Sequence, residues 1–228
     1  MHIYELDGVQ YPSVTTIIKL ISINDDLMKW ANYMGFKRKN IKEIQDESAE
    51  FGTIVHSNLR AIIDPNAPPA DIFKDPRKEY EFSIIKRRFI EYFSSIEYKT
   101  IDTEMTLISP KFGYAGTLDW LARISDGKKD RLLLLDFKTS KSIKTTMYLQ
   151  LGGYYNLLKE ININVDGAGI IIVNERECTM HPISKEKLEE FSETFISLVS
   201  FYKMWEKFSD FKPEYDIIRI LKKQNDNT

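Results

Sequence analysis

Two acidic residues, a lysine and a Gln-Tyr pair are the side chains of this chain whose spacing suits chemistry. Asp119 closes the segment 116–119, and Asp136 follows a run of leucines and opens the tripeptide Asp-Phe-Lys. Both acids therefore stand where a buried strand should meet solvent. Because successive side chains of a strand point to opposite faces, Asp136 and Lys138 share a face while Phe137 turns into the core. The sequence thus predicts two carboxylates and an ammonium group at a common site.

This combination suits metal-dependent cleavage of a phosphodiester. A hard divalent cation takes oxygen ligands, and Lys138, as a point charge, suits a hydroxide ion or an oxyanion. Gln150 and Tyr154 are spaced i, i+4 on an expected helix, so they share a face and can touch the lysine, a carboxylate or a phosphate. The alternative for each piece alone is structural, since an Asp at a strand end commonly forms a turn and Asp-x-Lys also occurs by chance.

In this order the motifs resemble those of the PD-(D/E)XK nuclease superfamily, and specifically its RecB-type branch. Members of that branch carry an early helical His, an Asp after a Gly, Asp-x-Lys and Gln-x-x-x-Tyr. Residues 11–18, 27–30 and 52–56 are also similar to the opening of the single-strand exonucleases that include the mitochondrial genome maintenance exonuclease and phage relatives. The resemblance implies an α/β fold: a restriction-endonuclease-like core, with a central mixed β-sheet flanked by helices, and an N-terminal helical elaboration.

The resemblance also implies a metal site. His56 and the backbone carbonyl of Phe137 would complete it with Asp119 and Asp136, and one or two Mg2+ or Mn2+ ions would bind there. An imidazole ligand favours the transition metal. From the residues alone, a single His on a helix is more often a surface or boundary residue than a metal ligand.

Three further polar residues adjoin these motifs. Glu104 lies one expected strand before Asp119, where the superfamily often carries an acid, so it would contact a second metal ion or orient Lys138. A Glu on the exposed face of an edge hairpin is the alternative. Thr139 and Ser140 extend the Asp-Phe-Lys motif with hydroxyls that could meet a phosphate, although such residues after a strand are also ordinary turn formers.

The overall charge does not point to a nucleic-acid ligand. The net charge is −2 and the pI about 6.0, whereas DNA-binding proteins usually show a basic footprint. The basic residues are grouped, however, at 37–39, at 86–88, and at Lys141 and Lys144 after the Asp-Phe-Lys motif. We expect Lys141 and Lys144 to contact nucleic acid because they adjoin the predicted site. A solvated face or a linker is the alternative for the other two groups.

Composition limits the class of protein. The chain has 228 residues, of which 43% are hydrophobic and 29% charged, as in an ordinary globular protein. Its apolar runs are too short to cross a bilayer and no secretory signal is visible, so we expect a cytoplasmic protein of a bacterium or a phage-infected cell. Its lone cysteine, Cys178, excludes an intramolecular disulfide and the four-cysteine iron–sulfur cluster of some RecB-type nucleases.

Periodicity and turn residues predict the order of the elements. We expect a hairpin around Asp7-Gly8, a helix capped by Ser13, another that begins at Asp25 or Asp26, and helices at about 42–62 and 75–95. Next should come strands at about 98–109, 113–125 and 131–138, a helix at 145–160, strands at 167–174 and 177–183, and a helix from 184 to about 208. This order predicts three regions: a hairpin and helices packing over the active site (1–97), an αβββαβ nuclease core that takes the His56 helix from the N-terminal part (98–212), and a C-terminal tail (213–228).

Aromatic residues accompany basic ones in the N-terminal helices. Most should face the core, because aromatic stripes at helical spacing usually do, while a subset could line a passage that stacks single-stranded bases. The residues concerned are Trp30, Tyr33, Phe36, Tyr80, Phe82, Phe89, Tyr92 and Phe93.

The expected function is metal-dependent hydrolysis of DNA, preferentially from single-stranded ends, in replication, recombination or repair. Asp119, Asp136 and His56 would hold the metal, Lys138 would position the attacking water, and the Gln-Tyr pair would orient the scissile phosphate. Replication or recombination proteins are the expected partners besides DNA. Two alternatives stay open: a structure-selective endonuclease that uses the same residues, and a non-catalytic nucleic-acid-binding module with a relic nuclease fold.

Overall fold

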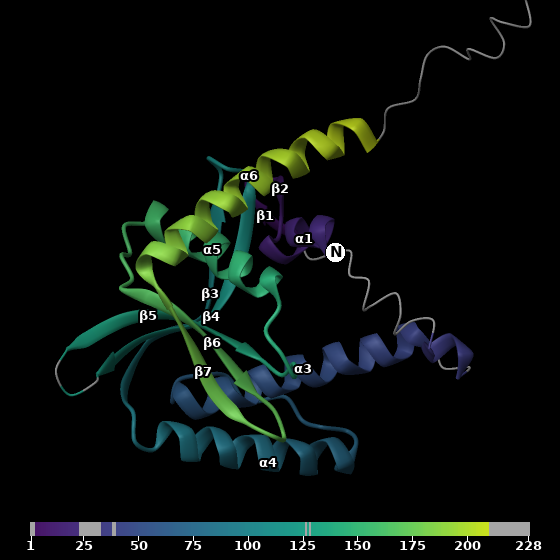
Figure 1. Ribbon diagram of the computed structural model, residues 1–228, viewed down its shortest axis with the longest axis vertical. Helices are drawn as coiled ribbons and strands as arrows, with labels where there is room; N and C mark the ends of the chain where they lie inside the picture. Colours follow the sequence, from purple (N-terminus) through teal and green to yellow (C-terminus); the bar gives the residue numbers. More distant parts are fainter. Residues whose placement is uncertain (1–2, 23–32, 38–39, 126, 128, 210–228) are drawn as a thin grey trace, which may run out of the picture.

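The computed structural model describes residues 3–22, 33–37, 40–125, 127 and 129–209. At its centre is one sheet of five strands, in the spatial order β3 (Glu97–Ser109), β4 (Tyr114–Ser125), β5 (Asp130–Lys138), β6 (Gly167–Val173) and β7 (Cys178–Ser184). β5 and β6 pair in parallel and the other neighbours are antiparallel, so the sheet is mixed. Helices cover both of its faces (Figure 1). The predicted α/β class, with a central mixed sheet flanked by helices, is confirmed.

The chain begins with a hairpin and a short capped helix. β1 (Ile3–Leu6) pairs with β2 (Val9–Pro12) across Asp7 and Gly8, whose φ values of 50° and 77° are those of a two-residue turn that favours glycine. Ser13 caps α1 (Val14–Ile18), its Oγ accepting the Thr16 N–H at 3.0 Å. The 3-10 turn η1 (Lys19–Ile21) follows. The start of the helix expected from Asp25 or Asp26 lies outside the described residues.

Two helices cover one face of the sheet. α3 (Ile41–Ile63) is capped by the Asn40 side chain, and α4 (Pro76–Phe93) is capped by Asp75 and has its proline in the first turn, where a missing N–H costs nothing. Their apolar sides pack against the sheet to form what we call the α3–α4 core. Its largest buried members include Leu59, Ile85, Phe89, Trp120 and Phe137.

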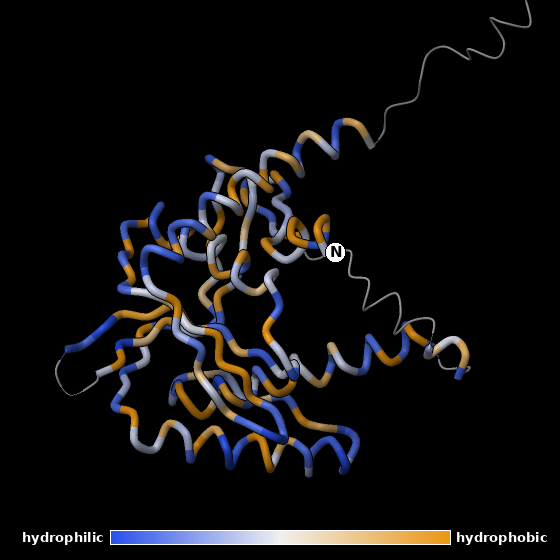
Figure 2. Tube along the Cα trace, viewed as in Figure 1, coloured by the Kyte–Doolittle hydropathy of each residue, from blue (hydrophilic) through white to orange (hydrophobic). Residues whose placement is uncertain are grey.

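The opposite face carries α5 (Thr145–Glu160) and α6 (Lys185–Ser209) together with α1, and we call the buried cluster there the α5–α6 core. β6 lies between the two cores, and all of its residues are buried, which explains its unbroken apolar sequence. Figure 2 shows hydrophobic residues gathering where helices and sheet meet. None of the helices in the described residues combines the length and the hydropathy needed to span a bilayer.

The N-terminal region is divided between the two faces. β2 contacts β4, and α1 contacts β4, α5 and α6. In contrast, α3 and α4 pack on the other side of the sheet. The boundary at residue 97 therefore stays a prediction about regions of sequence. The predicted tail, residues 213–228, lies outside the described part of the chain.

Gly152 allows α5 and α6 to approach closely. A Cβ at this position would lie 2.4 Å from the carbonyl carbon of Phe191, a backbone atom of α6 that cannot rotate away. We expect Gly152→Ala to lower the free energy of unfolding by about 1–3 kcal/mol through overpacking, measured by urea denaturation. Gly35→Ala is the matched control, because a Cβ there meets nothing within 4 Å. Equal stability of the two variants would contradict this account of the helix pair.

Candidate active site

The predicted carboxylates meet where β4 parts from β5. The two strands pair from Ser125↔Asp130 up to Trp120↔Leu135, and Asp119 and Asp136 are the next residues beyond that last pair. Here the Phe137 N–H donates to Asp119 Oδ2 at 2.8 Å. The Asp119 side chain of β4 thus accepts from a backbone N–H of β5 beyond the last pair of the two strands. This hydrogen bond holds Asp119 beside Phe137, the residue that follows Asp136.

The alternation of β4 reverses at Asp119. Tyr114 and Leu118 lie in the α5–α6 core, whereas Trp120 and Ala122 lie in the α3–α4 core. All four have even numbers, so a regular strand would place them on one face. The irregularity explains why the Asp119 side chain lies beside the Phe137 amide at the junction between the two faces.

Glu104 of β3 lies opposite this irregularity. Its neighbours pair as Thr103↔Trp120 and Met105↔Leu118, so Asp119 is the residue across from it. Glu104 has a φ of 54°, an uncommon value for a residue other than glycine, and such a conformation costs on the order of 1–3 kcal/mol. The surrounding strands hold this strained backbone in place beside Asp119.

His56 reaches the same point from α3. Its Nδ1 is 3.4 Å from Asp119 Oδ2, and its ring meets the Phe137 ring edge-on, with centroids 5.9 Å apart. One ligand atom each from His56, Glu104 and Asp119 lie within 4.8 Å of one another. An imidazole with two carboxylates is a donor set that fits a divalent transition metal such as Mn2+, and it tolerates Mg2+ less well.

Asp136 is paired with Lys138 on the other side of the junction. Its side chain is 1% exposed, and the Lys138 ammonium contacts its Oδ2. Apart from that ion pair, no group in the described chain hydrogen bonds to either carboxylate oxygen. Buried carboxylate oxygens with so few partners are rare, because their desolvation is costly unless a cation or water compensates it. Asp136 is not among the three residues whose ligand atoms converge, but its oxygen that does not contact Lys138 is free to ligate a metal ion.

The two carboxylates have opposite pKa shifts. Burial raises the pKa of Asp136 to about 6; the Lys138 ammonium opposes this and the Asp119 charge adds to it. Burial acts in the same direction on Asp119, but the charge and hydrogen bond of His56, the charge of Lys138 and the Phe137 N–H together lower its pKa. Asp119 is therefore the more acidic member of the pair, and Asp136 is the one that takes up a proton first as the pH falls toward about 6. Burial and the Asp119 charge likewise raise the pKa of Glu104.

The neighbouring carboxylates raise the pKa of both basic groups. Burial would lower the pKa of His56, yet Asp119 raises it by charge and by hydrogen bonding, so the net shift is upward. Burial also opposes the charge of Lys138, while Asp136 and Asp119 raise its pKa above the usual value. Lys138 is thus an ammonium ion suited to donating hydrogen bonds and stabilising negative charge, and unsuited to accepting a proton.

Gln150 and Tyr154 adjoin the carboxylates from α5. Gln150 Nε2 donates to the Tyr154 hydroxyl at 2.8 Å, which leaves the phenol proton for another acceptor. Burial raises the pKa of Tyr154 well above its usual value, and the charges of Asp136 and Asp119 add to the shift. A Cβ at Gly116 would lie 2.7 Å from the Tyr154 ring, so the glycine before Asp119 makes room for this tyrosine.

The remaining predicted residues lie along the connection from β5 to α5. Ser140 Oγ donates to the Ser142 carbonyl at 3.0 Å, and the Ser140 carbonyl accepts from the Asn174 amide at 3.2 Å. Thr139 Oγ1 would be 3.6 Å from a Cβ at Gly52, so this connection touches α3. Lys141 and Lys144 are exposed. Their contact with nucleic acid stays a prediction.

The other basic groups and the aromatic residues are dispersed. Arg87 lies 3.9 Å from Glu91, and Arg88 donates to the Glu175 carbonyl, while residues 38–39 lie outside the described part. The aromatic residues divide between core and surface. Phe82, Phe89 and Phe93 are buried, Tyr92 is partly buried, Tyr33, Phe36 and Tyr80 are exposed, and Trp30 falls among the residues that are not described.

A cavity of about 550 Å³ opens beside the His56, Glu104 and Asp119 cluster. The other residues that line it are Thr53, Ser57, Arg60, Pro68, Pro69 and Asp71. Sequence reasoning did not single out Arg60 or Ser57. Arg60 is nevertheless four residues beyond His56, a spacing that places both side chains on one face of a helix.

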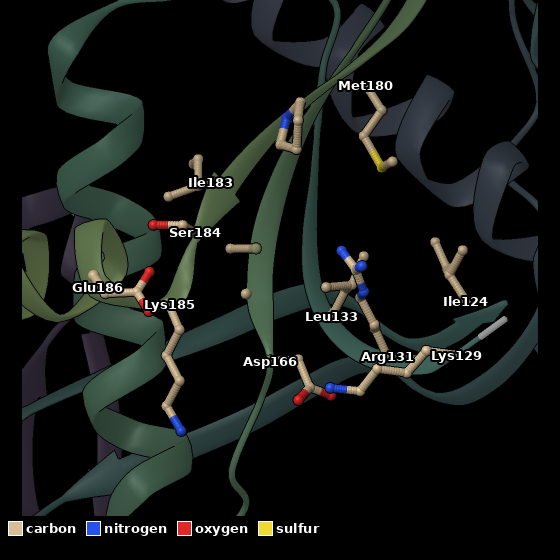
Figure 3. Close-up of a pocket in the computed structure, with 13 residues that line it drawn as sticks. Ile124, Lys129, Arg131, Leu133, Asp166, Met180, Ile183, Ser184, Lys185 and Glu186 are labelled. Carbon is tan, nitrogen blue, oxygen red and sulfur yellow. The ribbon is translucent and has the colours of Figure 1, made fainter. Parts of the chain in front are cut away.

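A second cavity, of about 570 Å³, lies at the opposite end of β5 and contains none of the predicted site residues. Figure 3 shows Leu133 and Met180 among side chains of both charges, including Asp166, Lys185 and Glu186. This cavity lacks the convergent ligands of the first one. The cavity beside His56 is therefore the candidate active site.

Comparisons with known proteins give similarity at the level of structure only. No protein-family model matches the chain, and no curated protein sequence matches it. The structure of SSO0001 is similar over 86% of this chain and 79% of its own, with 17% identity and a TM-score of 0.42. LHK-Exo, in complex with dAMP, is similar over 87% and 90%, with 9% identity and a TM-score of 0.41. At this level of similarity neither structure determines what this chain binds.

We expect metal affinity to rise with pH between about 5 and 7, because a cation must displace the protons of its ligands. The pKa of Asp136 is about 6, and that of His56 is raised above 6.5, so both groups are largely protonated at the acidic end. Titration calorimetry with Mn2+, in buffers of different ionisation enthalpy, measures the affinity and the protons released. His56→Gln should release fewer protons than the wild type. An affinity that does not change across this range would contradict a site built on these two groups.

Proposed function

We propose that this protein is a metal-dependent deoxyribonuclease with an active site of the PD-(D/E)XK type, RecB branch, which hydrolyses DNA preferentially from single-stranded ends. The observation that supports this best is the buried Asp136 carboxylate, which contacts Lys138 through one oxygen while its other oxygen has no hydrogen-bond partner in the described chain. That second oxygen can ligate a metal ion, and the cavity beside Asp119 provides access for a substrate. The motifs that resemble the RecB-type branch supply the residues of this site in the expected order.

The metal ligands proposed are His56, Asp119 and Asp136 with the Phe137 carbonyl, and Glu104 on the cavity side. A bound divalent ion would supply Lewis acidity toward a phosphoryl oxygen and lower the pKa of a bound water. The pKa of Asp119 is lowered, so this residue offers an ionised ligand at neutral pH without a proton to displace.

Lys138 has an electrostatic role in this proposal. Its ammonium group has three donors, of which Asp136 takes one, so others remain for the attacking water and a phosphoryl oxygen. Because its pKa is raised, the charge persists when the phosphate becomes more negative in the transition state. Tyr154 remains a neutral phenol and can donate to the phosphate while Gln150 holds its oxygen.

The size of the cavity suits a nucleotide. The cavity volume of about 550 Å³ lies within the roughly 300–1,000 Å³ typical of pockets for drug-sized ligands, a class that includes one nucleotide. Lys141 and Lys144 are exposed on the connection that follows Lys138 and are available for phosphates.

Asp136→Asn and Lys138→Ala should each reduce cleavage of single-stranded DNA by at least about 10³-fold, because the first removes an anionic metal ligand and the second removes the cation that stabilises the transition state. Cleavage is measured with Mn2+ on labelled oligonucleotides, and the fold by circular dichroism. Asp130→Asn is the matched control, since this exposed acid of the same strand lies at the far end of β5. Undiminished, EDTA-resistant activity in either variant would refute the assignment.

Linear single-stranded DNA should be degraded while a covalently closed circle of the same sequence stays intact, because an exonuclease requires a free end. Gel analysis of both substrates with the wild-type protein and Mn2+ measures this. Linearisation of the circle would instead identify an endonuclease of the same superfamily. Absence of cleavage of every substrate, together with no Mn2+ binding at Asp119 and Asp136, would indicate a relic nuclease fold.

A further inference from the structure

We propose that Arg60 and Ser57 form an anion subsite that binds the phosphate next to the scissile one. This inference rests on the proposed nuclease function and extends it to residues outside the predicted motifs. Both side chains line the cavity of about 550 Å³ that also exposes His56, Glu104 and Asp119. The subsite is therefore next to the proposed metal ligands.

Arg60 is held in place by β3. Its Nε donates to Thr103 Oγ1 at 2.9 Å and one terminal nitrogen donates to the Thr103 carbonyl at 3.5 Å. Thr103 in turn donates to Asp64 Oδ2 at 2.8 Å and is 5% exposed. A guanidinium group has five N–H donors, so several remain for a ligand after these contacts. The guanidinium group is thus fixed in position and still has N–H donors for a ligand.

The charge of Arg60 is not matched by an ion pair. In the part of the chain that the structure describes, no carboxylate oxygen lies within 4.0 Å of its guanidinium nitrogens. Asp64, the nearest acid in its hydrogen-bond chain, accepts from Thr103. The charge of Arg60 reaches Asp64 and Glu104, since it acts to lower the pKa of each, but neither is in direct ion-pair contact with it. A fixed guanidinium that lines a cavity and has no carboxylate in direct contact is suited to a phosphate, which it can bind in a bidentate manner.

Ser57 provides a second donor. Its Oγ accepts the Asp71 N–H at 3.0 Å, so the hydroxyl proton is available to a ligand. Thr53, which also lines the cavity, already donates its hydroxyl proton to the Ala49 carbonyl at 3.0 Å. The polar donors thus gather at the Ser57 and Arg60 end of the helix face.

The acidic side chains of the cavity make this subsite dependent on the cation. Glu104, Asp119 and Asp71 also line the cavity, and they repel a phosphate as long as their charge is uncompensated. A divalent ion on the first two would reverse the local field. A nucleotide should therefore bind well only with the metal present, at which point Arg60 contributes charge-assisted hydrogen bonds.

The test pairs a protein variant with a neutral phosphate analogue. Single-stranded oligonucleotides carry one methylphosphonate linkage, on either side of a defined scissile bond. We expect Arg60→Gln to lower kcat/KM on unmodified DNA by about 10- to 100-fold, mainly through KM, as for loss of hydrogen bonds to a charged group. With the wild type, kcat/KM on one of the two modified substrates should fall by a similar factor. With Arg60→Gln, that same modification should lower kcat/KM no further.

Controls separate this role from a structural one. Arg77→Gln removes the same charge at a site where the arginine is 91% exposed and paired with Asp75, and it should leave KM unchanged. Arg60→Lys should recover part of the affinity. If Arg60 only ties α3 to β3, Arg60→Gln will slow cleavage of charged and neutral linkages by the same factor, and the subsite is refuted.

A binding measurement keeps the subsite distinct from the nuclease function. Titration calorimetry of a deoxynucleoside 5′-monophosphate into the Mn2+-loaded wild type should detect binding that Arg60→Gln weakens at least about 10-fold and that EDTA removes. Such binding without DNA cleavage would support the subsite and overturn the nuclease proposal. If the protein cleaves DNA but Arg60→Gln leaves nucleotide binding and KM unchanged, the nuclease proposal is supported and the subsite is refuted.

Discussion

The hydrogen bond from the Phe137 amide to the Asp119 carboxylate is the contact on which the site depends. A strand that leaves its neighbour exposes backbone donors, and a buried donor must find a partner. Asp119 supplies that partner and is thereby held beside the strand that carries Asp136 and Lys138. Glu104 occupies a strained conformation across from it on β3. Irregular strand geometry therefore brings together groups that a regular sheet would place on opposite faces.

Burial of several charges at this junction determines its chemistry. The Asp136 carboxylate loses its water and gains little besides Lys138, so burial raises its pKa, while Asp119 keeps enough partners for its pKa to fall. The Asp136 carboxylate has few partners in the described chain, and a divalent cation would offset part of its desolvation cost. A buried carboxylate with few partners lowers the stability of this region, whereas the proposed function requires that carboxylate. A bound cation would remove this conflict.

The two cores supply different parts of the site. The α3–α4 core positions His56 and, one turn later, Arg60, because the buried side of α3 turns these two side chains toward the sheet junction and its cavity. The α5–α6 core positions Tyr154, whose ring occupies the space left by Gly116. The site lies between the cores, so relative movement of the helix layers would separate its ligands from one another.

Periodicity, caps and turn residues predicted nearly every element from the sequence, because Ser13, Asp75 and the Asp7-Gly8 turn act locally and the apolar patterns have clear periods. The motif spacing likewise placed Asp136 and Lys138 on one face. Other features follow only from tertiary structure. The φ of Glu104, the reversal of alternation at Asp119 and the division of the N-terminal region between two faces depend on how strands and helices pack, as do the partners of Arg60. Such features arise from contacts between residues far apart in the chain. The local sequence pattern reflects only the conformational preferences of residues that are close together in the chain.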